Sequence, residues 1–236
     1  MMDKIIPISI FPGGMINCFI IKGPEKHILV DTGVPDSEQK ILRQLKKHHI
    51  RQEDIALIIV THCHIDHFGS AGKLKEILKV PVLAHSLDVS AYRSGKATLD
   101  TMKPNKAQWY LFKLLIANQK AVPFEPDILM KGDMEYNLHE WGISGKVIHT
   151  PGHTPGSLSV ILENGEAIIM DMLASGILLG GIMFKSRVKH PPFHDDLNEL
   201  KKSFDKVLNE KGDLYYLGHG GPVDRAQIIK YYEELL

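Results

Sequence analysis

The side chains with the clearest chemical potential stand in one short segment, residues 61–69, which reads THCHIDHFG. It places His62, His64, Asp66 and His67 within six positions. Neutral imidazoles and carboxylates bind divalent metal ions when a rigid base makes several of them converge. At this chain's residue frequencies, the pattern H-x-H-x-D-H is expected by accident in roughly 0.002 chains of this length. The segment therefore predicts a metal site.

If the site holds two metal ions about 3.5–4 Å apart, it needs about seven protein ligands, so further ligands must come from other segments. His153 lies in TPGHTPGS, Asp171 follows an apolar run over 167–170, and His219 lies in GHGG. Each stands beside glycine or at a strand end, where the backbone can approach a metal closely. An isolated histidine more often has a packing role, and a strand-end aspartate often caps a turn. Their motifs favour ligation here.

The predicted elements place these segments at strand ends. Residues 55–60 (IALIIV) are typical of a buried strand, which would deliver the histidine-rich loop. The first half of the chain predicts strands over 4–10, 16–22, 27–31, 55–60 and 80–84, with helices over about 38–48 and 70–79. The second half predicts strands over 134–138, 145–150, 157–162, 167–170 and 214–217, with helices over about 195–209 and 224–235. Two sheet-forming halves with outer helices are one layered solution.

Between these halves, residues 86–131 have a different character, with helices expected over about 86–94 and 105–119. We interpret them as a helical insertion within one domain that spans residues 1–236. A chain of 236 residues can bury one sizeable core without being divided.

Composition excludes several functional classes. The 28 basic and 28 acidic residues cancel, and a pI near 7.2 lacks the basic excess of most nucleic-acid binders. Two cysteines, Cys18 and Cys63, make no disulfide framework and suit a reducing compartment. The longest apolar stretch, 172–184, has 13 residues, short of the roughly 20 that cross a bilayer. With no export signal visible at the N-terminus, we expect a cytoplasmic protein that binds neither nucleic acid nor membrane.

In order and spacing, the motifs resemble those of the metallo-β-lactamase-fold metallohydrolases. The resemblance rests on Asp31-Thr32-Gly33, the H-x-H-x-D-H loop, TPGHTPGS, the acidic residue Asp171 after a strand, and the final GHG. It implies an α/β fold, an αββα sandwich of two mixed β-sheets flanked by helices, with the site at one edge between the sheets. It also implies the ligand sets: His62, His64 and His153 for one metal, Asp66, His67 and His219 for the other, and Asp171 bridging both. Asp31 would orient ligands from behind.

The resemblance implies a dinuclear metal-dependent hydrolase acting on a small ester, thioester or lactone. A water bridging two divalent ions, expected to be Zn²⁺ with Mn²⁺ or Fe²⁺ as alternatives, would become the hydroxide nucleophile near neutral pH. Asp66 would be the catalytic proton acceptor. Alternatives are a phosphodiesterase or ribonuclease with the same centre, or a catalytically silent metal-binding protein. Asp171 stands where the best-known β-lactamases carry Cys, which disfavours antibiotic hydrolysis.

Substrate choice should depend on the insertion and on the loop over 172–193. That loop joins an apolar stretch to Lys185, Arg187, Lys189 and His190. It predicts a groove for a small anionic molecule with an apolar part. The alternative is that the loop packs against the core or forms a homodimer contact. The usual tyrosine of similar quorum-quenching lactonases is absent from 172–175, so lactonase activity stays an open possibility.

Overall fold

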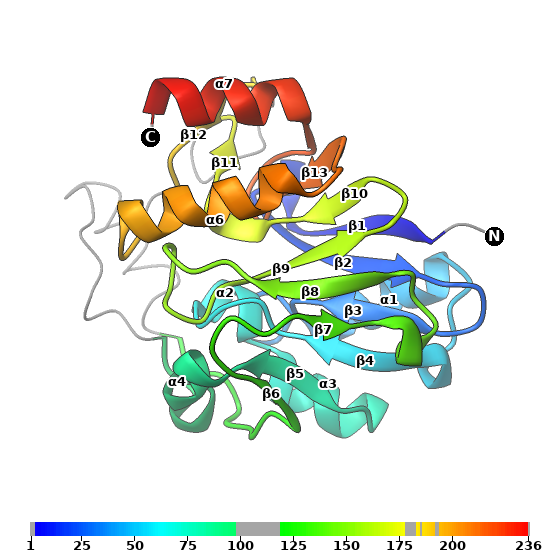
Figure 1. Cartoon of the computed structure of the whole chain (residues 1–236). Helices are drawn as coiled ribbons and strands as arrows, with labels where there is room; N and C mark the ends of the chain where they lie inside the picture. Colours follow the sequence, from blue (N-terminus) through cyan, green and yellow to red (C-terminus); the bar gives the residue numbers. More distant parts are fainter. Residues whose placement is uncertain (1–2, 98–118, 178–182, 185, 192–193, 236) are drawn as a thin grey trace.

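The computed structural model describes the whole chain except residues 1–2, 98–118, 178–182, 185, 192–193 and 236. Two six-stranded sheets lie against each other, with helices on their outer sides (Figure 1). Among the described residues, no helix is long and apolar enough to cross a membrane.

The first sheet has the strand order β1-β2-β3-β4-β5-β6. β1 to β3 pair antiparallel, and β3 to β6 pair parallel. Gly13 and Gly14 make the turn between the first two strands at φ 76° and 85°, a region that glycine enters without steric penalty. The strand bounds are β1 Lys4–Phe11, β2 Ile16–Lys22, β3 His27–Val30, β4 Ile55–Ile59, β5 Val82–His85 and β6 Ile128–Met130.

The second sheet has the order β14-β13-β10-β9-β8-β7, and only its β10–β13 pair is parallel. Its strand bounds are β7 Tyr136–Asn137, β8 Gly145–His149, β9 Leu158–Leu162, β10 Glu166–Ile168, β13 Leu214–Tyr216 and β14 Val223–Asp224. A separate antiparallel pair is formed by β11 (Ala174–Ser175) and β12 (Val188–Lys189).

The described α-helices are α1 Glu38–Lys47, α2 Ile65–Phe68, α3 Ala71–Leu78, α4 Val89–Ser94, α6 Leu197–Asn209 and α7 Arg225–Leu235. Short 3-10 helices include Pro12–Gly14, Gln52–Asp54, Ser86–Asp88, His139–Trp141 and Met170–Met172. Capping and amphipathic spacing define the longer helices. Asp196 accepts hydrogen bonds from the amides of Asn198 and Glu199 at the start of α6. In α1, Ile41 and Leu45 are buried on one face.

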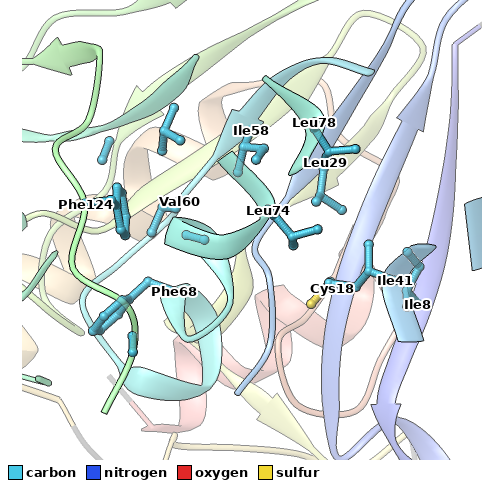
Figure 2. Packing of buried hydrophobic residues seen from close by; sticks show 14 of the residues in the cluster. Ile8, Cys18, Leu29, Ile41, Ile58, Val60, Phe68, Leu74, Leu78 and Phe124 are labelled. Carbon is cyan, nitrogen blue, oxygen red and sulfur yellow. The ribbon is translucent and has the colours of Figure 1, made fainter. Parts of the chain in front are cut away.

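The side chains of the strands alternate between two apolar layers on either side of the first sheet. Leu29 and Ile58 face the helical side, where Figure 2 shows them beside Leu74 and Leu78 of α3. Their neighbours in sequence fill the space between the sheets: Ile28, Val30, Leu57 and Ile59 meet Val147, Leu158 and Val160. A third cluster packs the second sheet against α6 and α7, and includes Phe204, Val207, Ile228 and Tyr231. The result is the αββα sandwich expected from the sequence.

The structure differs from the helical insertion expected over 86–131 at the C-terminal end of that segment. Its last residues form β6, which pairs in parallel with β5 and so belongs to the first sheet. A helix occupies part of the expected 86–94 segment, as α4. The helix expected over 105–119 lies, except for residue 119, outside the described residues. The loop over 172–193 also contains the β11–β12 pair, which the sequence did not indicate.

Candidate metal centre

The histidine-rich loop follows β4 and turns directly into the four-residue helix α2. His62 and His64 precede the helix, and Asp66 and His67 lie within it. Thr32 satisfies the last turn of this helix, because its amide and hydroxyl both donate to the carbonyl oxygen of His67, at 2.7 and 2.9 Å. All four metal-ligand candidates of this segment are buried.

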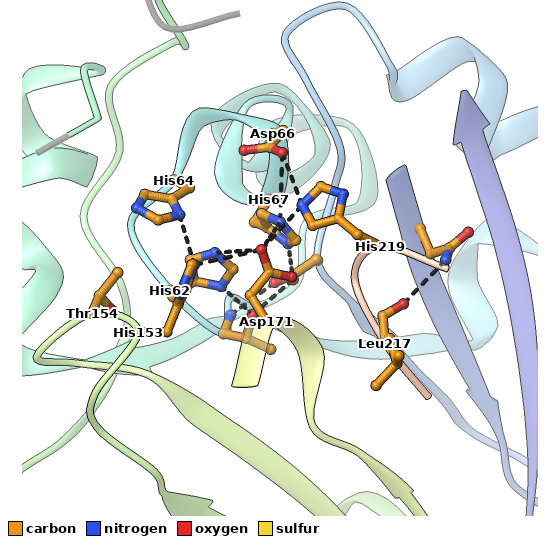
Figure 3. A network of polar contacts seen from close by, with 12 residues as sticks. His62, His64, Asp66, His67, His153, Thr154, Asp171, Leu217 and His219 are labelled. Atoms are coloured by element: carbon orange, nitrogen blue, oxygen red, sulfur yellow. Dashed lines mark hydrogen bonds and ion pairs between the residues drawn. The ribbon is translucent and has the colours of Figure 1, made fainter. Parts of the chain in front are cut away.

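The other three candidates arrive from the second half of the chain. His153 lies in the loop between β8 and β9, Asp171 in the 3-10 turn after β10, and His219 after β13. Figure 3 shows them converging on the histidine-rich loop. The structure thus brings together all seven residues that the sequence singled out. Their ligand atoms form two groups, each within 4.8 Å: His62, His64, His153 and Asp171 in one, and Asp66, His67 and His219 in the other. A third such group joins His62 and His67 to Asp31.

Asp171 lies between the two groups. Its Oδ2 atom is 3.5 Å from Nε2 of His153, 3.6 Å from Nε2 of His67 and 3.0 Å from Nε2 of His219. Asp66 belongs to the second group, and its Oδ2 atom is 3.5 Å from Nε2 of His219 and 3.7 Å from Nε2 of His67. One carboxylate oxygen of Asp171 therefore lies close to ligand atoms of both groups.

Several polar atoms of the centre are buried without a hydrogen-bond partner among the described residues. They are Nε2 of His62, Nε2 of His67 and Oδ1 of Asp171. Buried polar atoms are nearly always satisfied, and an unsatisfied one costs about 1–3 kcal/mol. Nδ1 of His64 and Nε2 of His153 also face one another at 2.9 Å. Imidazole nitrogens and carboxylate oxygens gathered in this way fit divalent metal ions, which take His and Asp ligands.

The electrostatics of the first group suit neutral imidazole ligands. Burial holds the pKa of His62 well below its ordinary value of 6.5, and the neighbouring histidines lower it further. Burial likewise lowers the pKa of His64 to about 3. Both rings are therefore neutral near pH 7, which is the form that coordinates a metal.

The second group combines histidines with carboxylates. Burial opposes charge here, but Asp171 and Asp66 outweigh it and raise the pKa of His67 well above 6.5. The pKa of His219 is raised for the same reason. In return, His219 and His67 overcome the effect of burial and hold the pKa of Asp171 well below its ordinary value. In the metal-free protein these histidines carry protons that metal binding would release.

Asp31 supports the second group from behind, as the sequence indicated. It follows β3 with φ 58°, and its carboxylate accepts hydrogen bonds from the amide and the hydroxyl of Thr61, at 2.8 and 2.7 Å. Its Oδ2 atom is also 2.8 Å from Nδ1 of His67. This contact directs Nε2 of His67 into the centre, as outer carboxylates commonly do for metal-binding histidines.

His219 is held by the N-terminal hairpin. Its Nδ1 atom lies 2.5 Å from the carbonyl oxygen of Met15. Asn17 donates from Nδ2 to the carbonyls of Leu217 and Gly220, at 3.1 and 3.0 Å. The sequence did not lead us to predict a role for Asn17, although a polar amide within the apolar strand β2 could have indicated one.

Gly218, next to His219, has no room for a side chain. An added Cβ would lie 2.1 Å from Oδ1 of Asp171 and 2.7 Å from Cε1 of His67. The glycine of the GHG motif therefore lets the backbone pass directly behind two ligand candidates.

A small pocket of about 80 Å³ adjoins the centre at His64. It is lined by Cys63, His64, Leu87, Asp88, Ser90, Thr154, Pro155 and Asp195. Leu87 is 59% exposed, so the rim of the pocket is partly apolar. Residues 87–90 belong to the 86–131 segment that the sequence predicted to influence substrate choice, but no individual role was predicted for them.

Two mixed sheets between helices, with a buried His/Asp centre at one edge, define a class of metal-dependent hydrolases. A family model described as the metallo-beta-lactamase superfamily matches residues 11–219, and the chain belongs to this superfamily.

Among relatives, a Methanocaldococcus jannaschii protein named as a probable metallo-hydrolase is 28% identical, over 89% of each chain. An N-acyl homoserine lactonase of a Bacillus species is 24% identical, over 89% of this chain and 85% of the lactonase. The fold resembles an archaeal metallo-beta-lactamase superfamily protein from Sulfolobus tokodaii, with a TM-score of 0.67 and 21% identity. That match covers 98% of this chain and 85% of the other.

Proposed function

We propose that this protein is a dinuclear metal-dependent hydrolase of small ester, thioester or lactone substrates. The observation that carries the proposal is the position of Asp171, whose Oδ2 atom lies within 3.6 Å of Nε2 of His153, His67 and His219. A carboxylate between two ligand groups suits a pair of ions held close together.

In this proposal, His62, His64 and His153 hold one ion, and Asp66, His67 and His219 hold the other. Asp171 would help to hold both. Zn²⁺ is the expected metal, although the same donor set accepts Mn²⁺ and Fe²⁺. When bound, such ions would lower the pKa of a shared water toward neutrality and polarise the carbonyl under attack.

Asp66 would accept and then donate the proton of the attacking water. Its side chain is only 3% exposed, and it lies on the ligand side of α2, beside His67 and His219. A carboxylate held there can accept the proton of the attacking water and pass it to the leaving oxygen or sulfur. Because Asp66, Asp171 and a hydroxide would together offset only three of the four metal charges, the loaded centre would attract anionic groups.

Exposed apolar side chains on a segment attached to the centre support an acyl substrate with an apolar part. The amide of Ser175 in β11 donates to the carbonyl oxygen of His219 at 3.0 Å, which attaches the β11–β12 segment to the centre. That segment carries Met183 and Phe184, which are 51% and 64% exposed. The lactonase of the Bacillus species acts on a substrate with an acyl chain, as its name states, and its similarity supports the same class here.

The test combines metal quantification with a panel of lactones, thioesters, simple esters and a phosphodiester. We expect about two ions per chain, turnover of at least one acyl substrate, and loss of turnover with a chelator. Asp66→Asn should lower kcat by about 100-fold or more while the circular dichroism spectrum is retained. Cleavage of the phosphodiester alone, or turnover that a chelator leaves unchanged, would contradict the proposal.

A further inference from the structure

Asp88 is a buried carboxylate outside the predicted ligand set. It ends the 3-10 turn that follows β5 and is only 2% exposed. Its Oδ2 atom accepts a hydrogen bond from the hydroxyl of Thr154 at 2.8 Å, and its Oδ1 atom accepts one from the amide of Gly156 at 3.0 Å. The backbone and the thiol of Cys63 also hydrogen-bond the carboxylate. Asp88 therefore has partners in two separate loops.

Both of those loops carry ligand candidates. Cys63 stands between His62 and His64, and Thr154 directly follows His153. One loop leaves β4 in the first sheet, and the other joins β8 to β9 in the second sheet. The loops share a backbone hydrogen bond, from the amide of Leu158 to the carbonyl of Thr61 at 2.9 Å. Asp88 adds a tie between them at the end where the imidazoles meet.

The backbone of the second loop is shaped around this carboxylate. A Cβ at Gly156 would lie 2.5 Å from Cγ of Asp88. Burial raises the pKa of Asp88 to about 6, although Thr154 and Gly156 favour the charged form through their hydrogen bonds. Burying a carboxylate disfavours folding unless it is fully hydrogen-bonded. The hydrogen bonds from both ligand loops satisfy this buried carboxylate, and its position between them suggests a role in holding the loops together.

We propose that Asp88 is a positioning residue, which ties the two loops together and so holds His64 and His153 close enough for one metal ion to bind both. The two imidazole nitrogens face one another at 2.9 Å, and their loops come from different sheets. Asp88 acts through Thr154, Gly156 and Cys63. This inference rests on the metal centre of the proposed function.

The test compares metal binding by full-length variants. Asp88→Asn keeps the size of the side chain but replaces one acceptor oxygen with a donor. Thr154→Val removes the hydroxyl that donates to Asp88, whereas Thr154→Ser keeps it. Asp3→Asn is the matched control, because Asp3 is also buried and accepts a backbone hydrogen bond, from Ser144 at 2.7 Å.

Zn²⁺ affinity would be measured by competition with a chromophoric chelator, and ligand geometry from the visible spectrum of the Co²⁺-loaded protein. We expect Asp88→Asn and Thr154→Val to bind Zn²⁺ about 10–100-fold more weakly and to change the Co²⁺ spectrum. Thr154→Ser and Asp3→Asn should retain the wild-type affinity and spectrum.

Unchanged affinity and spectrum in Asp88→Asn would overturn the inference, even if the melting temperature fell. Should Asp88→Asn fail to fold, equal affinities of Thr154→Val and Thr154→Ser would overturn it in the same way. A wild-type protein that binds no metal would instead refute the proposed function itself, so the two failures are distinguishable.

Discussion

Nδ1 of His67 lies 2.8 Å from Oδ2 of Asp31, and both side chains are fully buried. The carboxylate accepts the Nδ1 proton and leaves Nε2 facing Asp66 and Asp171. We therefore expect Asp31→Asn to weaken metal binding by about 10–100-fold, because the amide can present a donor to Nδ1 and favour the wrong tautomer. Chelator competition measures this change.

Asp36→Asn is the matched control for that variant. Asp36 also has a positive φ, 67°, but its side chain is 80% exposed. Asparagine tolerates this backbone region as aspartate does, so neither substitution adds backbone strain. Equal metal affinities of the two variants would show that the Asp31 carboxylate does not orient His67.

Gly218→Ala should strongly lower activity for a steric reason. The new methyl group would lie 2.1 Å from Oδ1 of Asp171, so either this carboxylate or the GHG loop must move. We expect kcat/KM to fall at least about 100-fold, because a displacement of about 1 Å is enough for such a loss. Gly132→Ala is the steric control: an added Cβ there meets no atom within 4 Å, so its φ of 58° adds backbone strain but no clash. A fully active Gly218→Ala enzyme would contradict the geometry of the centre.

Removing metal should lower thermal stability. The unsatisfied buried atoms of His62, His67 and Asp171 would gain partners only with metal bound. At free metal about 1,000 times Kd, binding stabilises the folded state by about 4 kcal/mol. That corresponds to about 10 °C in Tm for a chain of this size. Differential scanning calorimetry of chelator-treated and Zn²⁺-restored protein measures the shift, and superimposable melting curves would argue against a bound metal.

Asp88 should give the stability of the metal-free protein a recognisable pH dependence. Its folded pKa of about 6 exceeds the ordinary 3.8, so the folded state keeps a proton that the unfolded chain releases. The resulting contribution to the free energy of unfolding is fully present below pH 4 and is lost as the pH rises through about 6. The free energy of unfolding of wild type minus that of Asp88→Asn should drop by about 3 kcal/mol over this range. Chemical denaturation at several pH values measures it, and a constant difference would disprove the pKa shift.

Most of the candidate centre could be predicted from the sequence because its residues stand in dense local motifs. His62, His64, Asp66 and His67 occupy one loop, and the predicted strand before them correctly placed that loop at a sheet end. His153 and His219 were recognisable beside glycines, and the apolar run ending at residue 170 marked Asp171. The spatial meeting of these segments follows from the order of strands, which the family resemblance implied.

The features that were missed depend on contacts between distant segments. β6 has only three residues, and its pairing with β5 becomes visible only when the sheet is assembled. Asp88 follows a serine and a leucine, where an aspartate normally suggests a helix cap, and its partners Thr154 and Gly156 lie 66 and 68 residues away. A short strand or a single buried carboxylate leaves no periodic pattern in the sequence.

The hydrogen bonds around His219 impose an order on folding. Asn17 is 200 and 203 residues from its partners Leu217 and Gly220, and Met15 is 204 residues from His219. Contacts of such separation form late, because the loop between them must first be closed. During synthesis the first hairpin must wait for nearly the whole domain before it finds the GHG loop. Metal capture by the second ligand group would therefore report that a newly made chain has completed its fold.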